Sequence, residues 1–317
     1  MAFEHVSVLL NETVDGLNVK PDGVYVDATL GGGGHAYEVC RRLGSKGRFI
    51  GIDQDADAIK AAGERLKGFG EKVTIIRSNY RDMKPQLQNI GVDKVDGIVI
   101  DLGVSSYQLD TAERGFSYRV DAPLDMRMDG EEECNSSLTA EEILAEWSIK
   151  DLTHIFRDYG EDANAYQIAK GIVRHRENGG YVKTTGELVE LIRYILPAPV
   201  QRKMGGHPAR KIFQALRIAV NDEINALNEA LDGAVKVLAP GGKIIVISYH
   251  SLEDRMVKHR FRKWKEEWLG DMNPRKALVP TEEEIESNYK SRSAKLRVFE
   301  TEIKNGGVPN ALQRIPT

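Results

Sequence analysis

Glycine and aspartate residues near the start of the chain have the spacing of a nucleotide-binding turn. Four consecutive glycines occupy positions 31–34, and Gly31, Gly33 and Ala36 satisfy the pattern G-x-G-x-x-G/A. Glycine lets a backbone approach a ligand closely, and the N–H groups at a helix N-terminus favour polar or anionic groups. Asp53 follows about 20 residues later, where a carboxylate can accept hydrogen bonds from both hydroxyls of a ribose. Together these residues predict a site for an adenosine-containing cofactor.

Two cofactors fit such a site, a nicotinamide dinucleotide and S-adenosylmethionine, which has a ribose and adenine but no pyrophosphate. A methyltransferase places its acceptor beside polar residues at the end of a further strand, and the segment 101–106, which begins with Asp101, supplies them. A Pro-Gly-Gly turn at 240–242 also suits methyltransferase topology, whereas no His/Asp or Tyr/Lys pair is placed for hydride transfer. We therefore favour S-adenosylmethionine, and a dehydrogenase is the enzymatic alternative.

Short apolar runs lead into these polar residues and predict the strands that position them. The runs lie at 24–29, 48–52, 73–76, 97–100 and 243–247. Helix-like stretches at 36–43 and 56–66 separate the first three runs. Near-continuous apolar strands that alternate with helices are typical of a parallel sheet covered on both faces, so the fold class is a doubly wound α/β domain.

The middle of the chain departs from this alternation. Between residues 110 and 206 only helix signals occur, including two T-x-x-E capping boxes that begin at Thr139 and Thr184. We predict a core formed by 1–109 and 207–317, interrupted by an all-helical insertion at 110–206.

Two helices are predicted after the insertion. Apolar residues spaced three or four apart from Ile212 to Leu238 predict one long amphipathic helix. A basic helix extends to about Trp268, with Phe261 and Trp264 between its charges, and a second basic cluster lies near the C-terminus. Although charge runs are usually solvated faces, cations interleaved with aromatic rings suit RNA phosphates and bases. The basic residues are Arg255, Lys258, His259, Arg260, Arg262, Lys263 and Lys265, then Lys290, Arg292, Lys295 and Arg297.

Composition limits the class of protein. The chain has 317 residues, of which 41% are hydrophobic and 29% charged, with a net charge of −4, so it is neither disordered nor basic enough to coat nucleic acid. Cys40 and Cys134 form neither a disulfide framework nor a cysteine zinc site, and no metal cluster is evident. Without a basic leader or a long apolar stretch, we expect a cytoplasmic protein that does not contact a membrane.

The order of motifs over nearly the whole chain closely resembles the bacterial RsmH/MraW family. The matching segments are H-V-S-V-L-L at 5–10, D-A-T-L-G-G-G-G-H at 27–35, D-L-G-V-S-S at 101–106, E-R-G-F-S at 113–117, P-L-D-M-R-M-D at 123–129, H-P-A-R at 207–210, S-Y-H-S-L-E-D-R at 248–255 and R-S-A-K-L-R at 292–297. The resemblance implies a class I (Rossmann-like) S-adenosylmethionine methyltransferase core with an inserted helical substrate domain. It also implies that the target is the exocyclic N4 of a cytidine in the decoding region of 16S ribosomal RNA, within the small ribosomal subunit.

The resemblance also implies roles for particular residues. Those expected to bind the cofactor are Gly33, Gly34 and His35 at its methionine end, Asp53 at its ribose, Tyr80 at its adenine, and Asp101 and Gln108 where the pocket closes. The oligomeric state is not fixed by the sequence, and a homodimer is one option.

Asp101 is the candidate catalytic residue. The N4 lone pair of cytosine is delocalised into the ring, so a carboxylate that accepts a hydrogen bond and then a proton would assist attack on the methyl group. Leu102 and Gly103 stand where many amino-methyltransferases have two prolines, so Asp101 either acts as this base or only orients the cofactor. Tyr249 and His250 are the next candidates to contact the cytosine ring of the substrate. A catalytically silent RNA-binding protein is the alternative from another class.

Overall fold

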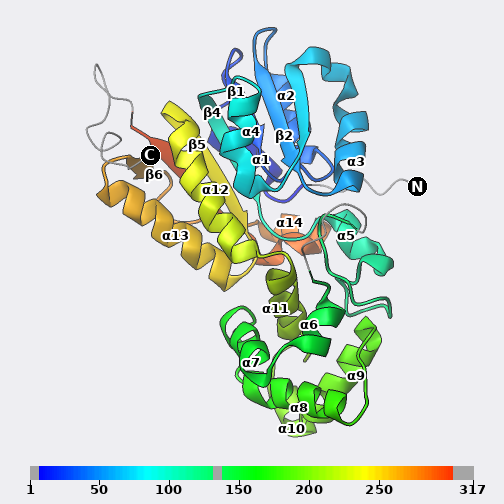
Figure 1. Cartoon of the computed structure of the whole chain (residues 1–317). Coiled ribbons are helices and arrows are strands. Elements are labelled where there is room, and N and C mark those ends of the chain that lie inside the picture. Colours follow the sequence, from blue (N-terminus) through cyan, green and yellow to red (C-terminus); the bar gives the residue numbers. More distant parts are fainter. Residues whose placement is uncertain (1–6, 131–137, 303–317) are drawn as a thin grey trace. The chain divides into compact units, whose positions relative to one another are not determined.

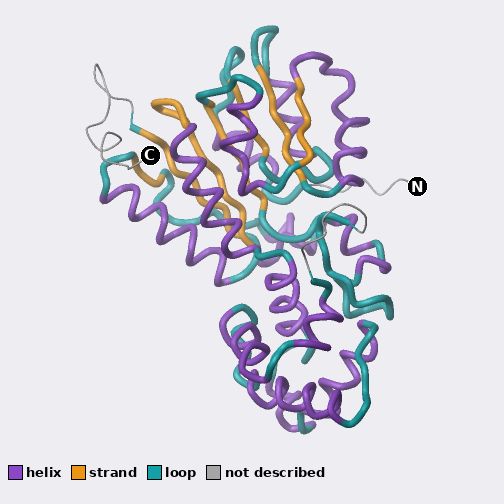
Figure 2. Tube along the Cα trace, viewed as in Figure 1, coloured by secondary structure: helices purple, strands orange, loops and turns teal. Residues whose placement is uncertain are grey.

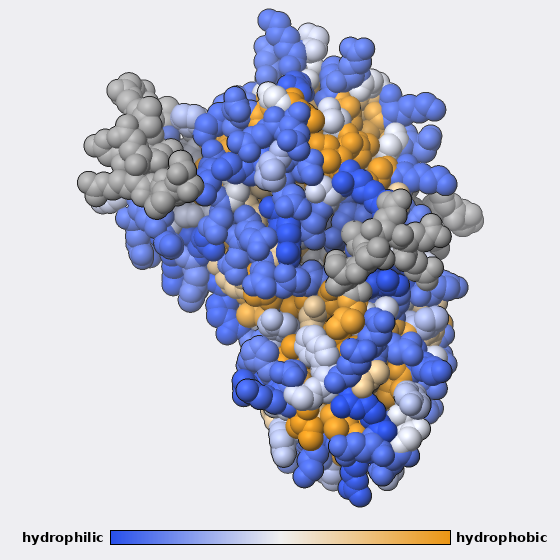
Figure 3. Space-filling view, in the orientation of Figure 1, coloured by the Kyte–Doolittle hydropathy of each residue, from blue (hydrophilic) through white to orange (hydrophobic). Residues whose placement is uncertain are grey.

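The computed structural model describes residues 7–130 and 138–302. It divides into two compact units, a core unit formed by Met1–Gly103 with Asn225–Thr317 and a helical unit, Val104–Ile224. Both are drawn in Figure 1, and the face seen in Figure 3 is mostly hydrophilic, with smaller apolar areas in each unit. The helical unit begins earlier and ends later than the insertion predicted at 110–206.

The core unit contains a seven-stranded sheet of order β3-β2-β1-β4-β5-β7-β6. Its first five strands are parallel, and β7 runs antiparallel to both β5 and β6. The strands are β1 Val24–Asp27, β2 Arg48–Asp53, β3 Val73–Arg77, β4 Val95–Asp101, β5 Leu238–Ser248, β6 Gly270–Met272 and β7 Lys295–Thr301. This arrangement is Rossmann-like, as the sequence predicts.

Helices cover both faces of this sheet (Figure 2). Side chains alternate between the faces along a strand, so Tyr25 of β1 packs in one apolar cluster and Val26 packs in the other. The Tyr25 cluster includes α1 Leu10–Leu17, α2 Gly34–Arg42 and α3 Ala56–Leu66, and the Val26 cluster includes α4 Met83–Asn89, α12 Glu223–Val237 and α13 Ser251–Glu266. The remaining core elements are η1 Lys67–Lys72, η2 Tyr80–Asp82, α14 Glu282–Ser287 and η4 Tyr289–Ser293.

The helical unit has an apolar core of its own. Its elements are α5 Ser106–Asp110, η3 Ala112–Arg114, α6 Ala140–Glu146, α7 Ile149–Asp158, α8 Ala165–Glu177, α9 Thr185–Ile195, α10 Ala198–Lys203 and α11 Arg210–Val220. Both predicted capping boxes are confirmed, with Thr139 and Thr184 each accepting from a backbone N–H at the start of a helix. The helical character of this region therefore follows from local sequence signals.

The single long helix predicted from Ile212 to Leu238 is wrong. Helix α11 ends at Val220, and Asp222 has a φ of 48°, which interrupts the chain before α12 begins. The apolar residues of α11 pack in the helical unit, whereas those of α12 pack under the core sheet. Each helix has an apolar face because each packs against an apolar core, one in each unit. The apolar spacing therefore continues across the break in the backbone.

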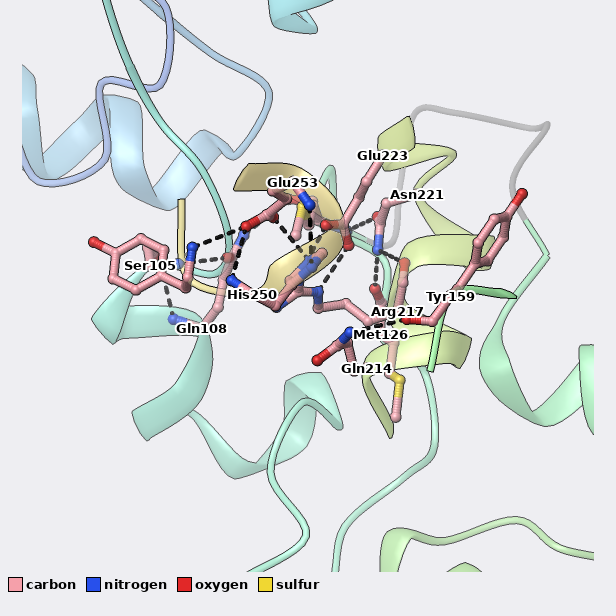
Figure 4. Close-up of polar contacts among 12 residues, drawn as sticks. Ser105, Gln108, Met126, Tyr159, Gln214, Arg217, Asn221, Glu223, His250 and Glu253 are labelled. Carbon is pink, nitrogen blue, oxygen red and sulfur yellow. Dashed lines mark hydrogen bonds and ion pairs between the residues drawn. The ribbon is translucent and has the colours of Figure 1, made fainter. Parts of the chain in front are cut away.

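Polar contacts of Asn221 fix this break within the helical unit (Figure 4). Its Nδ2 donates to the carbonyl oxygens of Met126 and Arg217 at 2.8 and 2.9 Å, and its Oδ1 accepts from the N–H of Met128 at 2.8 Å. The Arg217 guanidinium also donates twice to Glu223, at 2.8 Å each. These bonds join the C-terminal end of α11 to Met126 and Met128 and to the first residue of α12.

Candidate active site

Three neighbouring strands of the core end in aspartates. Asp27 of β1 lies opposite Gly51 of β2 and Val99 of β4. Asp53 and Asp101 therefore lie two residues further along their strands, on the same side of the sheet as Asp27's partners. The strand order reverses between β1 and β4, and open α/β sheets bind ligands beyond the carboxyl ends of strands at such a point. The sheet topology therefore concentrates carboxylates where a ligand would lie.

The glycine turn between β1 and α2 supplies space beside these carboxylates. Gly31 and Gly33 have φ angles of 50° and 74°, in the left-handed region that favours glycine. A side chain at Gly32 would meet nothing within 4 Å, whereas one at Gly34 would collide with the side chain of Ser7. The turn thus leaves space for a ligand beside Gly32, whereas the Ser7 side chain occupies the space beside Gly34.

Asp53 is attached to this turn. Its Oδ2 accepts from the N–H of Gly31 at 2.8 Å and its Oδ1 from the N–H of Asp55 at 2.9 Å. Burial raises the pKa of Asp53, and the two N–H donors oppose that shift. Because each carboxylate oxygen can accept more than one hydrogen bond, Asp53 retains acceptor capacity for a hydroxyl pair.

Asp101 lies in a polar network at the end of β4. Its Oδ1 accepts from the Tyr249 hydroxyl at 2.8 Å, and its backbone N–H donates to the Thr29 hydroxyl at 2.6 Å. Burial raises the pKa of Asp101 to about 7, the Tyr249 hydrogen bond lowers it and the negative charge of Glu253 raises it. Since 24% of its side-chain surface is still exposed, Asp101 combines a near-neutral pKa with access from solvent.

Asp27 is a member of this cluster that the sequence reasoning did not single out as a site residue. Its Oδ1 accepts from the N–H of Thr29 at 3.1 Å, and only 2% of the residue is exposed. Burial raises its pKa to about 6, an increase that His35 opposes and that Asp101 adds to. The signal was available, because Asp27 ends a buried apolar run just as Asp53 and Asp101 do.

His35 is buried at the start of α2 beside both carboxylates. Its Nε2 lies 3.0 Å from the carbonyl oxygen of Val8, and its Nδ1 lies 3.9 Å from Asp101 Oδ2. Burial lowers the pKa of His35, so the ring is neutral. A carbonyl oxygen can only accept, so we assign the ring proton to Nε2, which leaves the Nδ1 lone pair on the side of Asp101.

Tyr80 and Gln108 belong to other segments of the chain than this cluster. Tyr80 begins η2 just after β3, and the N–H of Ser78 in the same loop donates to the Asp53 carbonyl at 2.9 Å. Gln108 belongs to the helical unit, where its Oε1 accepts from the N–H of Ser105 at 3.0 Å and closes a capping box (Figure 4). The core edge thus brings together Gly33, Gly34, His35, Asp53 and Asp101, and Tyr80 follows the next strand.

The proposed stacking role of Phe261 and Trp264 is wrong. The two rings are 0% and 3% exposed, lie 5.3 Å apart and both pack against Phe299 in the core. Several cations of α13 are paired within the chain, Arg260 with Asp232, Lys263 with Glu267 and Lys265 with Asp271. Helix α13 is therefore amphipathic, with its aromatic face buried and its basic face exposed.

The two residues after β5 differ in role. His250 is the N-cap of α13, where its Nδ1 accepts from the N–H of Glu253 at 3.4 Å and its Nε2 lies 3.0 Å from a Glu253 oxygen. Burial and the neighbouring charge of Asp101 raise the pKa of Tyr249, which keeps its hydroxyl protonated as the donor to Asp101. Of the two, only Tyr249 donates a hydrogen bond to Asp101, the candidate general base.

Comparison with known proteins identifies the family. A model described as the MraW methylase family matches residues 2–302. The chain belongs to this family. It is 52% identical to ribosomal RNA small subunit methyltransferase H 2 of Agathobacter rectalis, over 95% of this chain and 99% of that protein. It is 50% identical to ribosomal RNA small subunit methyltransferase H of Lachnospira eligens, over 95% of this chain and 98% of that protein.

Family membership makes the chain a methyltransferase, as the order of its motifs predicts. It also decides against the dehydrogenase and the catalytically silent RNA-binding protein. Among the residues that the structure describes, no helix has the length and apolar character needed to cross a membrane.

Proposed function

We propose that this methyltransferase transfers a methyl group from S-adenosylmethionine to the exocyclic N4 of a cytidine in the decoding region of 16S ribosomal RNA, acting in the cytoplasm on the small ribosomal subunit. The observation that carries the proposal is family membership over residues 2–302, and the near-neutral Asp101 at the sheet edge gives it a chemical basis.

The residues at the sheet edge fit this cofactor. Space at Gly32 admits a ligand against the backbone, Asp53 can hold ribose hydroxyls, and the group of carboxylates suits a ligand with a positive charge. S-adenosylmethionine, when bound, supplies a methyl group on a positively charged sulfur. In this proposal Gly33, Gly34 and His35 hold its methionine end and Tyr80 its adenine.

Asp101 acts on the target amine in this proposal. The carboxylate accepts a hydrogen bond from the N4 amino group, which draws the nitrogen lone pair out of the ring, and it takes the proton that the amine must lose. A pKa of about 7 suits a general base at neutral pH. Tyr249 fixes Oδ1 through its 2.8 Å bond, so Oδ2 is the oxygen left for the amine.

The helical unit has a different surface from a phosphate-binding domain. Residues 104–224 contain 15 Lys and Arg against 20 Asp and Glu, a net charge of −5. The unit instead exposes Tyr166, Tyr181 and Tyr194, at 59%, 68% and 89%. We propose that it contributes to RNA recognition through stacking of unpaired bases on these rings.

Methyl transfer to purified small subunits tests the proposed function. We expect incorporation of labelled methyl into 16S RNA that mass spectrometry maps to N4 of one cytidine, with a smaller yield on naked RNA. Methylation of a ring carbon, a ribose hydroxyl or another RNA would overturn the proposed target. A stronger calorimetric response to NAD than to S-adenosylmethionine would overturn the proposed cofactor.

A further inference from the structure

A groove of about 460 Å³ lies beside the candidate active site within the core unit. The segment 249–251 after β5 forms one part of its wall, and Val279, Pro280, Ile285 and the segment 292–295 form the rest. Leu278 and Leu296 exchange two backbone hydrogen bonds of 2.9 Å, which hold the chain next to Val279 against β7. The groove is thus built from segments that are fixed to the sheet.

The lining of the groove is part apolar and part cationic. Val279, Pro280 and Ile285 present apolar surface, and Arg292 and Lys295 are its two lining cations. Arg292 is exposed and lies over the ring of Tyr289, with the guanidinium carbon 5.7 Å from the ring centre. None of the residues that line the groove is acidic.

Lys295 carries charge that its ion pair does not cancel. Its Nζ lies 3.2 Å from Asp254 Oδ2, but the same carboxylate accepts from Arg297 Nε at 2.7 Å. One carboxylate shared by Lys295 and Arg297 leaves this group of three charges with a net positive charge. Lys295 also keeps 46% of its side-chain surface exposed, so it can reach an anion in solvent.

We propose that this groove binds a nucleotide of the single-stranded RNA substrate next to the target cytidine, with the phosphate on Arg292 and Lys295 and the sugar or base on the apolar wall. The volume lies in the range of small-ligand sites, and the charge matches a phosphodiester. Tyr249 lines the groove while its hydroxyl contacts Asp101, which does not line it. The occupant is therefore a neighbour of the reacting base rather than that base. This inference rests on the proposed function for the identity of the RNA.

The test compares Arg292→Gln/Lys295→Gln with wild type in binding a short single-stranded RNA that contains the target cytidine. Each lost phosphate contact lowers the slope of log affinity against log salt by about 0.7 for single strands, so we expect a fall of about 0.7 to 1.4. Lys60→Gln/Lys67→Gln is the matched control, because it removes two exposed cations from α3 and η1, next to the edge strand β3. We expect this control to bind like wild type, and all three proteins to bind S-adenosylmethionine equally.

A series of RNAs with one neutral methylphosphonate linkage each locates the contact. Neutralising one linkage beside the target should weaken wild type and leave the Arg292/Lys295 variant unaffected. If the variant keeps the wild-type salt slope, or responds to every linkage as wild type does, the groove does not bind a nucleotide of the RNA. Methyl transfer by wild type to purified small subunits, measured in parallel, separates the two proposals. Its absence refutes the proposed function, whereas an active wild type with an unaltered variant refutes only the binding of a nucleotide in the groove.

Discussion

Carboxylates are buried or partly buried at the carboxyl ends of β1, β2 and β4, whereas in α13 the aromatic side chains are buried and most of the charged ones face solvent. The arrangement in α13 is what apolar burial alone would produce. The arrangement at the strand ends opposes it, because burying carboxylates costs free energy unless other groups compensate. Residues placed against the packing preference are therefore the better guide to chemistry in this protein.

The largest effect should come from Asp101→Asn. The amide keeps the shape but cannot take a proton, and general-base assistance is typically worth about 10² to 10⁴ in rate. We expect a loss within that range in single-turnover methyl transfer, with cofactor and RNA affinities changed only a few-fold. If saturating S-adenosylmethionine restored the rate in full, Asp101 would be a cofactor-positioning residue instead.

Phe261→Ala in α13 should reduce stability rather than catalysis. Truncating a buried phenylalanine costs about 3 to 5 kcal/mol of stability, measured by denaturant unfolding. RNA affinity of the folded fraction should not change, since the ring does not reach solvent. Arg262→Gln, on the exposed face of the same helix, is the control and should alter stability by less than about 0.5 kcal/mol. A stable Phe261→Ala protein with weakened RNA binding would contradict this account of the helix.

Asp53→Ala should weaken S-adenosylmethionine binding without unfolding the core. Hydrogen bonds to a charged group are worth about 1.5 to 3 kcal/mol, which corresponds to a loss of roughly 10- to 150-fold by calorimetry. Lost bonds to Gly31 and Asp55 will also loosen the turn, so Asp53→Asn serves as the variant that keeps one oxygen acceptor. Unchanged affinity in both folded variants would remove Asp53 from the site.

The smallest effect is a shift in pH dependence. Only the ionised form of Asp101 can accept a proton, so the single-turnover rate should rise with pH through about 7. The Tyr249 hydrogen bond lowers the pKa of Asp101, so Tyr249→Phe should move the midpoint to higher pH. The rate measured well above both midpoints should be little changed. A midpoint that stays in place would show that Tyr249 does not act through the carboxylate.

The five parallel strands, and the carboxylates at the ends of β1, β2 and β4, could be predicted from the sequence because apolar runs followed by aspartate are a local signal. The antiparallel strands β6 and β7 were not predicted, since β6 has three residues and β7 begins within a basic cluster. The break at Asp222 could not, since apolar spacing does not indicate which of two cores a helix packs against. The burial of Phe261 and Trp264 could have been predicted, because Val257, Phe261 and Trp264 share one helical face. Residue types alone suggested base stacking, and only their periodicity indicates packing.

The aspartates at the ends of β1 and β4 also couple folding to proton uptake. The folded chain binds protons at Asp27 and Asp101 up to about pH 6 and 7, whereas an unfolded chain releases them near the ordinary value of 3.8. The stabilisation from this difference is complete below the ordinary value and is lost as the pH rises through 6 and 7. A cationic ligand at the same edge would favour the ionised carboxylates, so its binding would expel protons. Ligand affinity and fold stability therefore have opposite pH dependence in this core.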